Sequence, residues 1–134
     1  MAANVVADAV PSRTLWLGRI VSWLLALLLL VDGVAKLFKP GPVVEGTVKL
    51  GYAESAIIPI GIVLIVCTIL YLLPITQVLG AILLTGYLGG AVATHVRVGD
   101  GAFGVVFAVA FGVLIWLGLY LRDARVRSLV PTRN

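Results

Sequence analysis

The sequence predicts an all-α integral membrane protein, a bundle of four transmembrane helices joined by short loops. Of its 134 residues, 61% are apolar and only 12% are charged, whereas about a quarter of the residues in an ordinary soluble domain are charged. Residues 55–96 contain no Asp, Glu, Lys or Arg, and a stretch of this length fits two bilayer crossings of about 20 residues each. Residues 101–121 are also uncharged and fit a further crossing.

The first span is expected at residues 15–38, although this stretch contains charged residues. Arg19 and Lys36 lie ~26 Å apart along a helix, so their side chains can reach opposite membrane interfaces. The alternative is a cleaved signal peptide with its apolar core at residues 20–31. It is disfavoured because the GVA sequence that follows the core forms a poor cleavage site.

The remaining spans are separated by a proline and by charged residues. Pro74 has no backbone N–H, so it can end one helix and precede the next at little cost. Arg122 closes the last uncharged stretch. The four predicted spans are therefore residues 15–38, 57–73, 76–94 and 102–121.

These spans form a single transmembrane domain at residues 14–130, between a mobile tail at residues 1–13 and a C-terminal tail at residues 131–134. Residues 39–54 contain several Gly and Pro and form the only substantial loop. Four spans place both termini on one side of the membrane. Six of the ten Lys and Arg residues lie on that side, so the positive-inside rule predicts that both termini are cytoplasmic.

Small residues recur at every fourth position in the third and fourth spans. Lipid provides no hydrophobic driving force between helices, so their association depends on the close packing of small residues. We expect two such faces to meet, either within one bundle or across a dimer. They are Gly86, Gly90 and Thr94 on the third span, and Gly104, Ala108 and Gly112 on the fourth.

Ionisable residues near the membrane gather at the predicted outer end. Asp32 and Lys36 lie four residues apart on one helix face, which permits an ion pair, and Asp32 lies ~6 Å deeper. A carboxylate inside the membrane is costly unless it faces a partner or a wet cavity, so Asp32 is a candidate functional residue. The alternative is that the two residues only neutralise each other and fix the depth of the helix.

Other residues at the same end are candidates for ligand binding or proton handling. His95 is the only histidine, and histidine exchanges protons near neutral pH; the alternative is a simple hydrogen bond at the interface. Such residues can bind a polar head group whose apolar tail lies between the helices. The candidates are Asp32, Lys36, Glu54, Thr94, His95 and Arg97.

No sequence motif indicates a built-in catalytic or metal site. The H-E-x-x-H, G-x-S-x-G and P-loop motifs are absent from the sequence. One cysteine, Cys67, cannot carry out dithiol chemistry, and one histidine cannot form a bis-histidine haem site. The G-x-G-x-x-G at residues 99–104 lacks the preceding strand of a dinucleotide site. The net charge of +4 suits anionic lipid, so nucleic-acid binding is not expected.

Three segments together resemble the DoxX-like family of small four-helix bacterial membrane proteins. They are GVAKL at residues 33–37 followed by Pro40, YLLP at residues 71–74, and LGAILLTGYLGGAVATH at residues 79–95. The resemblance covers about residues 15–130. By motif match, it implies that the positions of interest are Gly33, Lys36, Gly90, Thr94 and His95.

This resemblance also implies a location and a class of function. It implies a multi-pass protein of the bacterial inner membrane. Named members of the family resemble the small membrane subunit of a thiosulfate:quinone oxidoreductase, and others belong to membrane oxidoreductase complexes linked to thiol or superoxide defence. This chain has no cysteine at its predicted outer face, which argues against a direct sulfur-relay role.

Three functional hypotheses follow. The first is a non-catalytic accessory or quinone-interacting subunit of a membrane oxidoreductase system, with quinone as the cofactor considered and a redox protein as partner. The second is a module that binds or transports a small amphipathic solute or lipid. The third is a structural scaffold that forms homo-oligomers through its glycine faces. The sequence leaves open whether the protein is an enzyme.

Overall fold

The computed structural model describes residues 11–129, and over this range the fold is helical without β-strands. Four helices are long and apolar enough to cross a membrane, which confirms the predicted all-α bundle. The predicted C-terminal tail and most of the predicted N-terminal tail lie outside the described residues. The four long helices are α2 (Ser12–Phe38), α4 (Ile57–Leu72), α5 (Gln77–Val98) and α6 (Phe103–Arg122).

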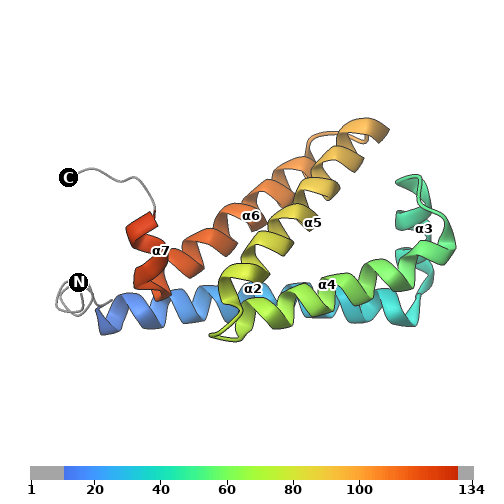
Figure 1. The fold of residues 1–134 in the computed structure, drawn as a ribbon. Helices are drawn as coiled ribbons and strands as arrows, with labels where there is room; N and C mark the ends of the chain where they lie inside the picture. Colours follow the sequence, from blue (N-terminus) through green and yellow to red (C-terminus); the bar gives the residue numbers. More distant parts are fainter. Residues whose placement is uncertain (1–10, 130–134) are drawn as a thin grey trace.

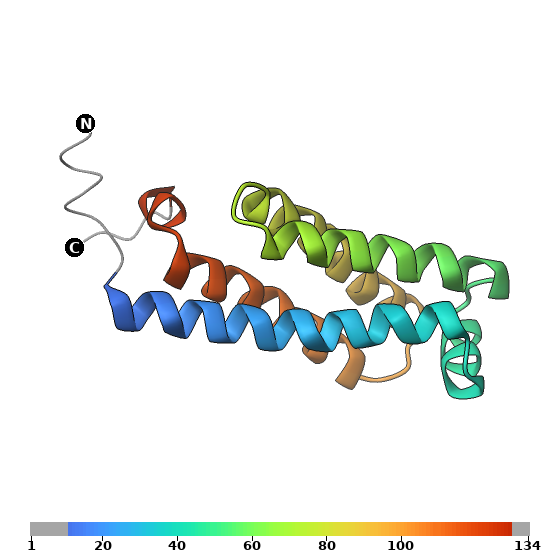
Figure 2. The same cartoon turned by 90° about the horizontal axis from the view of Figure 1, so that it is seen from below.

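The long helices pack as two antiparallel pairs, α2 with α4 and α5 with α6 (Figure 1). α2 also packs on α6, and α4 on α5, so each helix has two neighbours. We call the end where α2 begins and α6 ends the terminal end, and the opposite end the loop end. α2 and α4 run side by side (Figure 2), whereas the α5–α6 pair diverges from them toward the loop end (Figure 1).

The segment expected as the only substantial loop is partly helical. α3 (Gly41–Lys49) and a 3-10 turn, η1 (Glu54–Ala56), lie at the loop end. A proline occupies the first turn of α3, where its missing N–H removes no helical hydrogen bond. Lys39 (φ 52°) ends α2 and Gly51 (φ 92°) follows α3 in left-handed backbone conformations. The Pro and Gly residues therefore delimit a short helix instead of preventing one.

The bundle has an apolar interior and an apolar exterior. Leu64, Leu84 and Ile115 are fully buried between the helices. Trp23 and Phe103 are more than half exposed on the outside, where a soluble protein would carry polar residues. These outward side chains suit contact with lipid, as expected for a multi-pass membrane protein.

Two close contacts of α2 with its neighbours involve Gly18, Gly61 and Gly118, which the sequence prediction did not single out, and Gly33, which the family resemblance had named. A Cβ atom on Gly18 of α2 would lie 2.9 Å from the Gly118 oxygen of α6. On Gly61 of α4 it would lie 2.8 Å from the Gly33 oxygen of α2. Both distances are too short for a side chain, so glycine allows α2 to touch α6 near the terminal end and α4 near the loop end.

The small-residue faces expected on the third and fourth spans behave differently. Ala108 is buried, and a Cβ atom on Gly104 would overlap the His95 ring. A Cβ atom on Gly112 would lie 3.9 Å from Leu88, an ordinary contact. At Gly86 and Gly90 it would meet nothing within 4 Å. Within the described part of the chain the two faces therefore do not meet at Gly86 and Gly90; packing of another molecule on these two residues stays a prediction.

Candidate functional site

Asp32 and Lys36 form an ion pair one helical turn apart on α2, with 2.6 Å between Lys36 Nζ and Asp32 Oδ2. The Lys36 side chain is 14% exposed because its stem lies against Gly61 of α4, where any Cβ atom would come within 2.9 Å of it. The Asp32 side chain is 51% exposed. The pair thus combines a covered cation with an accessible anion.

The accessible carboxylate lies on the face of α2 that points into the bundle. Leu25 and Leu29, both buried, precede Asp32 by seven and three residues, and residues at these spacings share one helix face. The phenol of Tyr87 on α5 lies within electrostatic range of Asp32. The Asp32 side chain is nevertheless half exposed. An accessible carboxylate therefore lies on the inward face of α2 at the loop end.

Hydrogen bonds from the segment after α3 hold the end of α5. The Tyr52 hydroxyl lies 2.9 Å from Thr94 Oγ1, and Thr94 Oγ1 donates to the Gly90 carbonyl at 2.8 Å. Because the threonine proton is used on Gly90, Tyr52 is the donor to Thr94. Arg97 Nη2 donates to the Leu50 carbonyl at 3.0 Å. Thr94 and Arg97 thus attach the residues that follow α3 to α5. We call α3 together with residues 50–52 the α3 segment.

His95 and Glu54 have carboxylate and lysine partners of their own. His95 Nδ1 lies 2.8 Å from Asp100 Oδ2, and its imidazole ring packs on Gly104 of α6. Glu54 Oε1 lies 3.1 Å from Lys39 Nζ in an exposed pair. Within residues 11–129, no hydrogen bond or ion pair connects His95 to Asp32 or Lys36. The six candidates therefore share one end of the bundle without converging on a single pocket.

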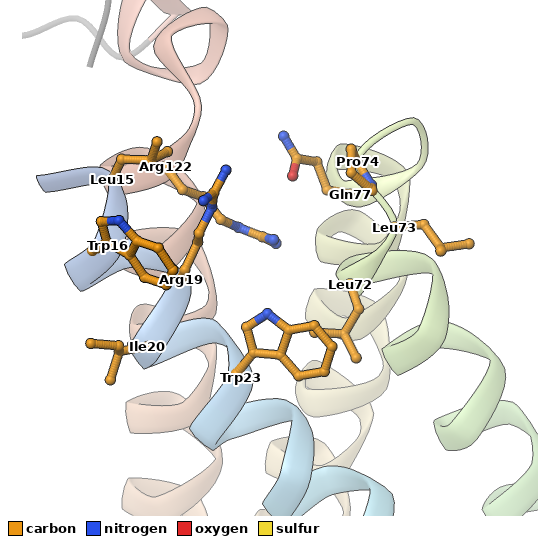
Figure 3. Close-up of a pocket in the computed structure, with 10 residues that line it drawn as sticks. All are labelled: Leu15, Trp16, Arg19, Ile20, Trp23, Leu72, Leu73, Pro74, Gln77 and Arg122. Carbon is orange, nitrogen blue, oxygen red and sulfur yellow. The ribbon is translucent and has the colours of Figure 1, made fainter. Parts of the chain in front are cut away.

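A pocket that the sequence prediction missed lies at the terminal end. It has a volume of about 830 Å³ and lies between the start of α2, the α4–α5 turn and the end of α6 (Figure 3). Trp16, Arg19 and Trp23 of α2 line one side, and Gln77 of α5 lies across from them. Arg122 contributes a second guanidinium.

Arg122 is held in this pocket by the end of α4. Its Nη2 donates to the Tyr71 carbonyl at 2.7 Å, and its guanidinium lies over the Tyr71 ring at 4.6 Å from the centroid. The Tyr71 hydroxyl donates to the Ile115 carbonyl at 2.7 Å and accepts from Ser22 Oγ at 3.1 Å. A buried tyrosine thus fixes the arginine by its ring and backbone. Gly18 directly precedes Arg19, and Gly118 lies one helical turn before Arg122. These glycines were the sequence signal that could have indicated a close helix contact beside the arginines.

Asp123, directly after α6, attaches the short helix α7 (Ala124–Leu129) to α5. Gln77 Nε2 donates to its carboxylate, and the Arg125 backbone N–H donates to Asp123 Oδ1 at 2.9 Å. Burial raises the pKa of Asp123, but hydrogen bonds from Arg125 and Gln77 and the charge of Arg125 outweigh it, so the pKa lies below its ordinary value. The Asp123 carboxylate therefore accepts hydrogen bonds from Gln77 and Arg125 and not from the α2 residues that line the pocket.

Neither a metal centre nor a reactive thiol is built into the described part of the chain. Among residues 11–129 no three His, Cys, Asp or Glu side chains are placed to hold a metal ion together. Cys67 is buried in the middle of α4. The chemistry that the loop end offers is hydrogen bonding and charge at Asp32, Lys36 and Tyr87.

The sequence matches one known protein family. A model of the DoxX-like family matches residues 20–118, which include most of α2, the whole of α3, α4 and α5, and most of α6. No curated protein and no solved structure matches the chain significantly. The matched range contains the whole loop end and most of the membrane-spanning residues.

Proposed function

From the premise that the chain belongs to the DoxX-like family, we propose that it is a non-catalytic accessory subunit of a membrane oxidoreductase system that binds a quinone at its loop end. Asp32 carries this proposal. It lies on the inward face of α2, about 9 Å from the helix end by helix rise, yet half of its side chain is accessible. An accessible carboxylate at this depth favours a polar partner besides Lys36.

The residues around Asp32 fit both redox states of a quinone. A quinol donates hydrogen bonds, and the Asp32 carboxylate has oxygen lone pairs besides the one used by Lys36. A quinone accepts hydrogen bonds, and the ammonium of Lys36 has three donors, one of which is used on Asp32. An apolar depression of about 370 Å³ lies on the adjacent turns of α2, lined by Leu30, Val31, Val34 and Ala35. Val31 and Val34 are exposed on the outside of α2, so an isoprenoid tail in this depression would lie along the outer face of the helix and not beneath Asp32.

The accessory role follows from what the loop end lacks. Within residues 11–129 the single cysteine is buried in α4, so a thiol pair of this part of the chain cannot reduce the quinone, and the proposed role assigns the supply of electrons to a partner protein. We place the protein in the bacterial inner membrane with the loop end outside, because six of its ten basic residues lie on the terminal side. The partner would then dock at the outer face.

Equilibrium binding of decylubiquinone to the purified protein in detergent micelles tests the proposal. We expect Asp32→Asn and Lys36→Ala each to weaken binding by about ten-fold, the loss typical of one hydrogen bond to a charged group. Lys39→Ala is the matched control, because it removes another, partly exposed lysine at the same end. It should bind as the unsubstituted protein does.

A charge exchange distinguishes ligand binding from a structural ion pair. Asp32→Lys combined with Lys36→Asp keeps an i,i+4 pair on the same face but moves the carboxylate toward the helix end. If the pair only fixes helix depth, the double variant behaves as the original protein. If it binds the quinone, affinity stays low although the helical circular dichroism is unchanged. Unaltered affinity in the single variants and the exchange would overturn the proposal.

A homo-oligomeric scaffold is the second candidate, and Gly86 and Gly90 support it. No residue among 11–129 lies within 4 Å of a Cβ atom built at either position, so a second copy has room to approach there. Gly90→Leu should then abolish cross-linked dimers in the membrane, while Asp32→Asn leaves them intact. Equal dimer yields from both variants would remove this candidate.

A further inference from the structure

The pocket at the terminal end brings together two guanidinium groups from different helices. Gly18 and Gly118 form the close crossing of α2 and α6. Arg19 follows the first of these glycines directly, and Arg122 lies one helical turn after the second. The crossing therefore puts the two arginines beside each other, and both side chains extend into the space facing the α4–α5 turn (Figure 3).

The described part of the chain does not neutralise this pair of charges. Arg19 and Arg122 lie close enough for their charges to repel, and neither forms an ion pair within residues 11–129. Asp123 attracts Arg122 electrostatically, but its oxygens accept hydrogen bonds from Arg125 and Gln77. An anion in the pocket would remove the repulsion between the two guanidiniums.

Aromatic rings hold both arginines in place before any ligand arrives. The Arg19 guanidinium lies over Trp16 at 5.4 Å from the ring centroid, and that of Arg122 lies over Tyr71 at 4.6 Å. Only Nη2 of Arg122 donates to an acceptor among residues 11–129, and its Nε is buried without one. Guanidinium donors arranged in this way match the oxygens of a phosphate group.

We propose that this pocket binds the phosphate group of an anionic phospholipid, with an acyl chain along its apolar wall. The wall identifies a lipid and not a free phosphate. Trp23 lies two helical turns further into the membrane than Trp16, about 10 Å by helix rise, and Ile20 and Leu72 line the pocket beside it. The pocket is therefore charged at the membrane surface and apolar below, and Trp16, close to the charged groups, is at a depth that suits the lipid interface.

Native mass spectrometry of the protein in vesicles of equal phosphatidylglycerol and phosphatidylcholine content tests this proposal. We expect retained phosphatidylglycerol to exceed phosphatidylcholine, and Arg19→Gln to reduce that preference about ten-fold, as for the loss of one charged hydrogen bond. Arg13→Gln is the matched control, because Arg13 is exposed near the same end and does not line the pocket. It should keep the preference.

Further outcomes separate the possible occupants. Arg122 also donates a hydrogen bond to Tyr71, so it is replaced by lysine and not by a neutral residue. Arg122→Lys keeps the charge but loses the forked arrangement of donors. It should lower the preference for phosphatidylglycerol while the protein stays folded. Equal losses in Arg13→Gln and Arg19→Gln would overturn the proposal in favour of diffuse attraction to the membrane. So would displacement of the lipid by millimolar inorganic phosphate, which would identify a free-anion site.

Discussion

The two ends of the bundle differ in whether their charged side chains have partners within the described residues. At the loop end, Asp32, Glu54 and His95 each have an oppositely charged or hydrogen-bonding partner at 2.6–3.1 Å. At the terminal end, Arg19 and Arg122 share a pocket without an acidic partner among residues 11–129. The loop end neutralises itself, whereas the terminal end is complementary to an external anion.

The same contrast appears in the packing of the helices. Near the terminal end, α2 and α6 touch through Gly18 and Gly118. At the loop end, the helix pairs diverge (Figure 1), and hydrogen bonds from Tyr52 and Arg97 connect the α3 segment to α5. The contact between α2 and α6 is therefore made by backbone, whereas polar side chains attach the residues after α3 to α5. The effects of substitutions at the two ends on stability should therefore differ in magnitude and in how far they extend through the bundle.

Gly118→Ala should have the largest effect on stability. The added Cβ atom would lie 2.6 Å from Ser22 Oγ and 3.1 Å from the Tyr71 hydroxyl, and overpacking of this kind costs about 1–3 kcal/mol. Gly86→Ala is the control, because its Cβ atom meets nothing within 4 Å. It should be neutral or stabilising by up to about 1 kcal/mol. Unfolding in mixed micelles, followed by circular dichroism, measures both; a loss of the same size in Gly86→Ala would contradict the contrast.

Tyr52→Phe should have a smaller and local effect at the loop end. It removes the hydrogen bond to Thr94 at 2.9 Å, while Thr94 still donates to Gly90. The expected loss is about 1 kcal/mol, which should speed amide hydrogen exchange in α3 about five-fold. Tyr120→Phe, whose hydroxyl makes no hydrogen bond within the described residues, should leave exchange in α3 unchanged. Faster exchange along the entire bundle in Tyr52→Phe would show that the contact is not local.

Asp123→Asn should have the smallest effect, visible as a change in pH dependence. The pKa of Asp123 is lowered by Arg125 and Gln77 in the folded protein, so its ionised form stabilises the fold above the ordinary carboxyl pKa of about 4. That contribution is lost as pH falls through the lower folded-state pKa. The difference in unfolding free energy between the original protein and Asp123→Asn should therefore shrink between pH 6 and pH 3. A constant difference over this range would mean that Asp123 is not stabilised in this way.

The fold could be predicted from the sequence because long uncharged stretches have few alternatives. Residues 55–96 had to form two crossings, and the structure divides them around Pro74. The helix at Gly41–Lys49 was missed because a nine-residue segment with two glycines and a proline has no strong helical signal of its own. The hydrogen bonds that attach the following residues, Leu50 and Tyr52, to α5 come from partners more than 40 positions away in the sequence.

The candidate site was predictable only where partners are close in sequence. The Asp32–Lys36 pair follows from the spacing of one helical turn. His95 meets Asp100 because Gly99 ends α5 with a left-handed φ of 72° and reverses the chain. The pocket at the terminal end joins residues of α2, α5 and α6, and no local spacing brings Arg19 to Arg122. Their meeting depends on the helix crossing at Gly18.

The accessibility of position 32 tests the central claim most directly. In a Cys67→Ala background, Asp32→Cys and Val31→Cys are treated with a membrane-impermeant maleimide in sealed vesicles, with and without decylubiquinone. Asp32 is half exposed on the inward face of α2, whereas Val31 is exposed on an apolar surface. We therefore expect Asp32→Cys to react, decylubiquinone to slow that reaction, and Val31→Cys to stay unlabelled. Equal labelling of both positions, or a rate at position 32 that decylubiquinone does not change, would contradict a ligand site at the loop end.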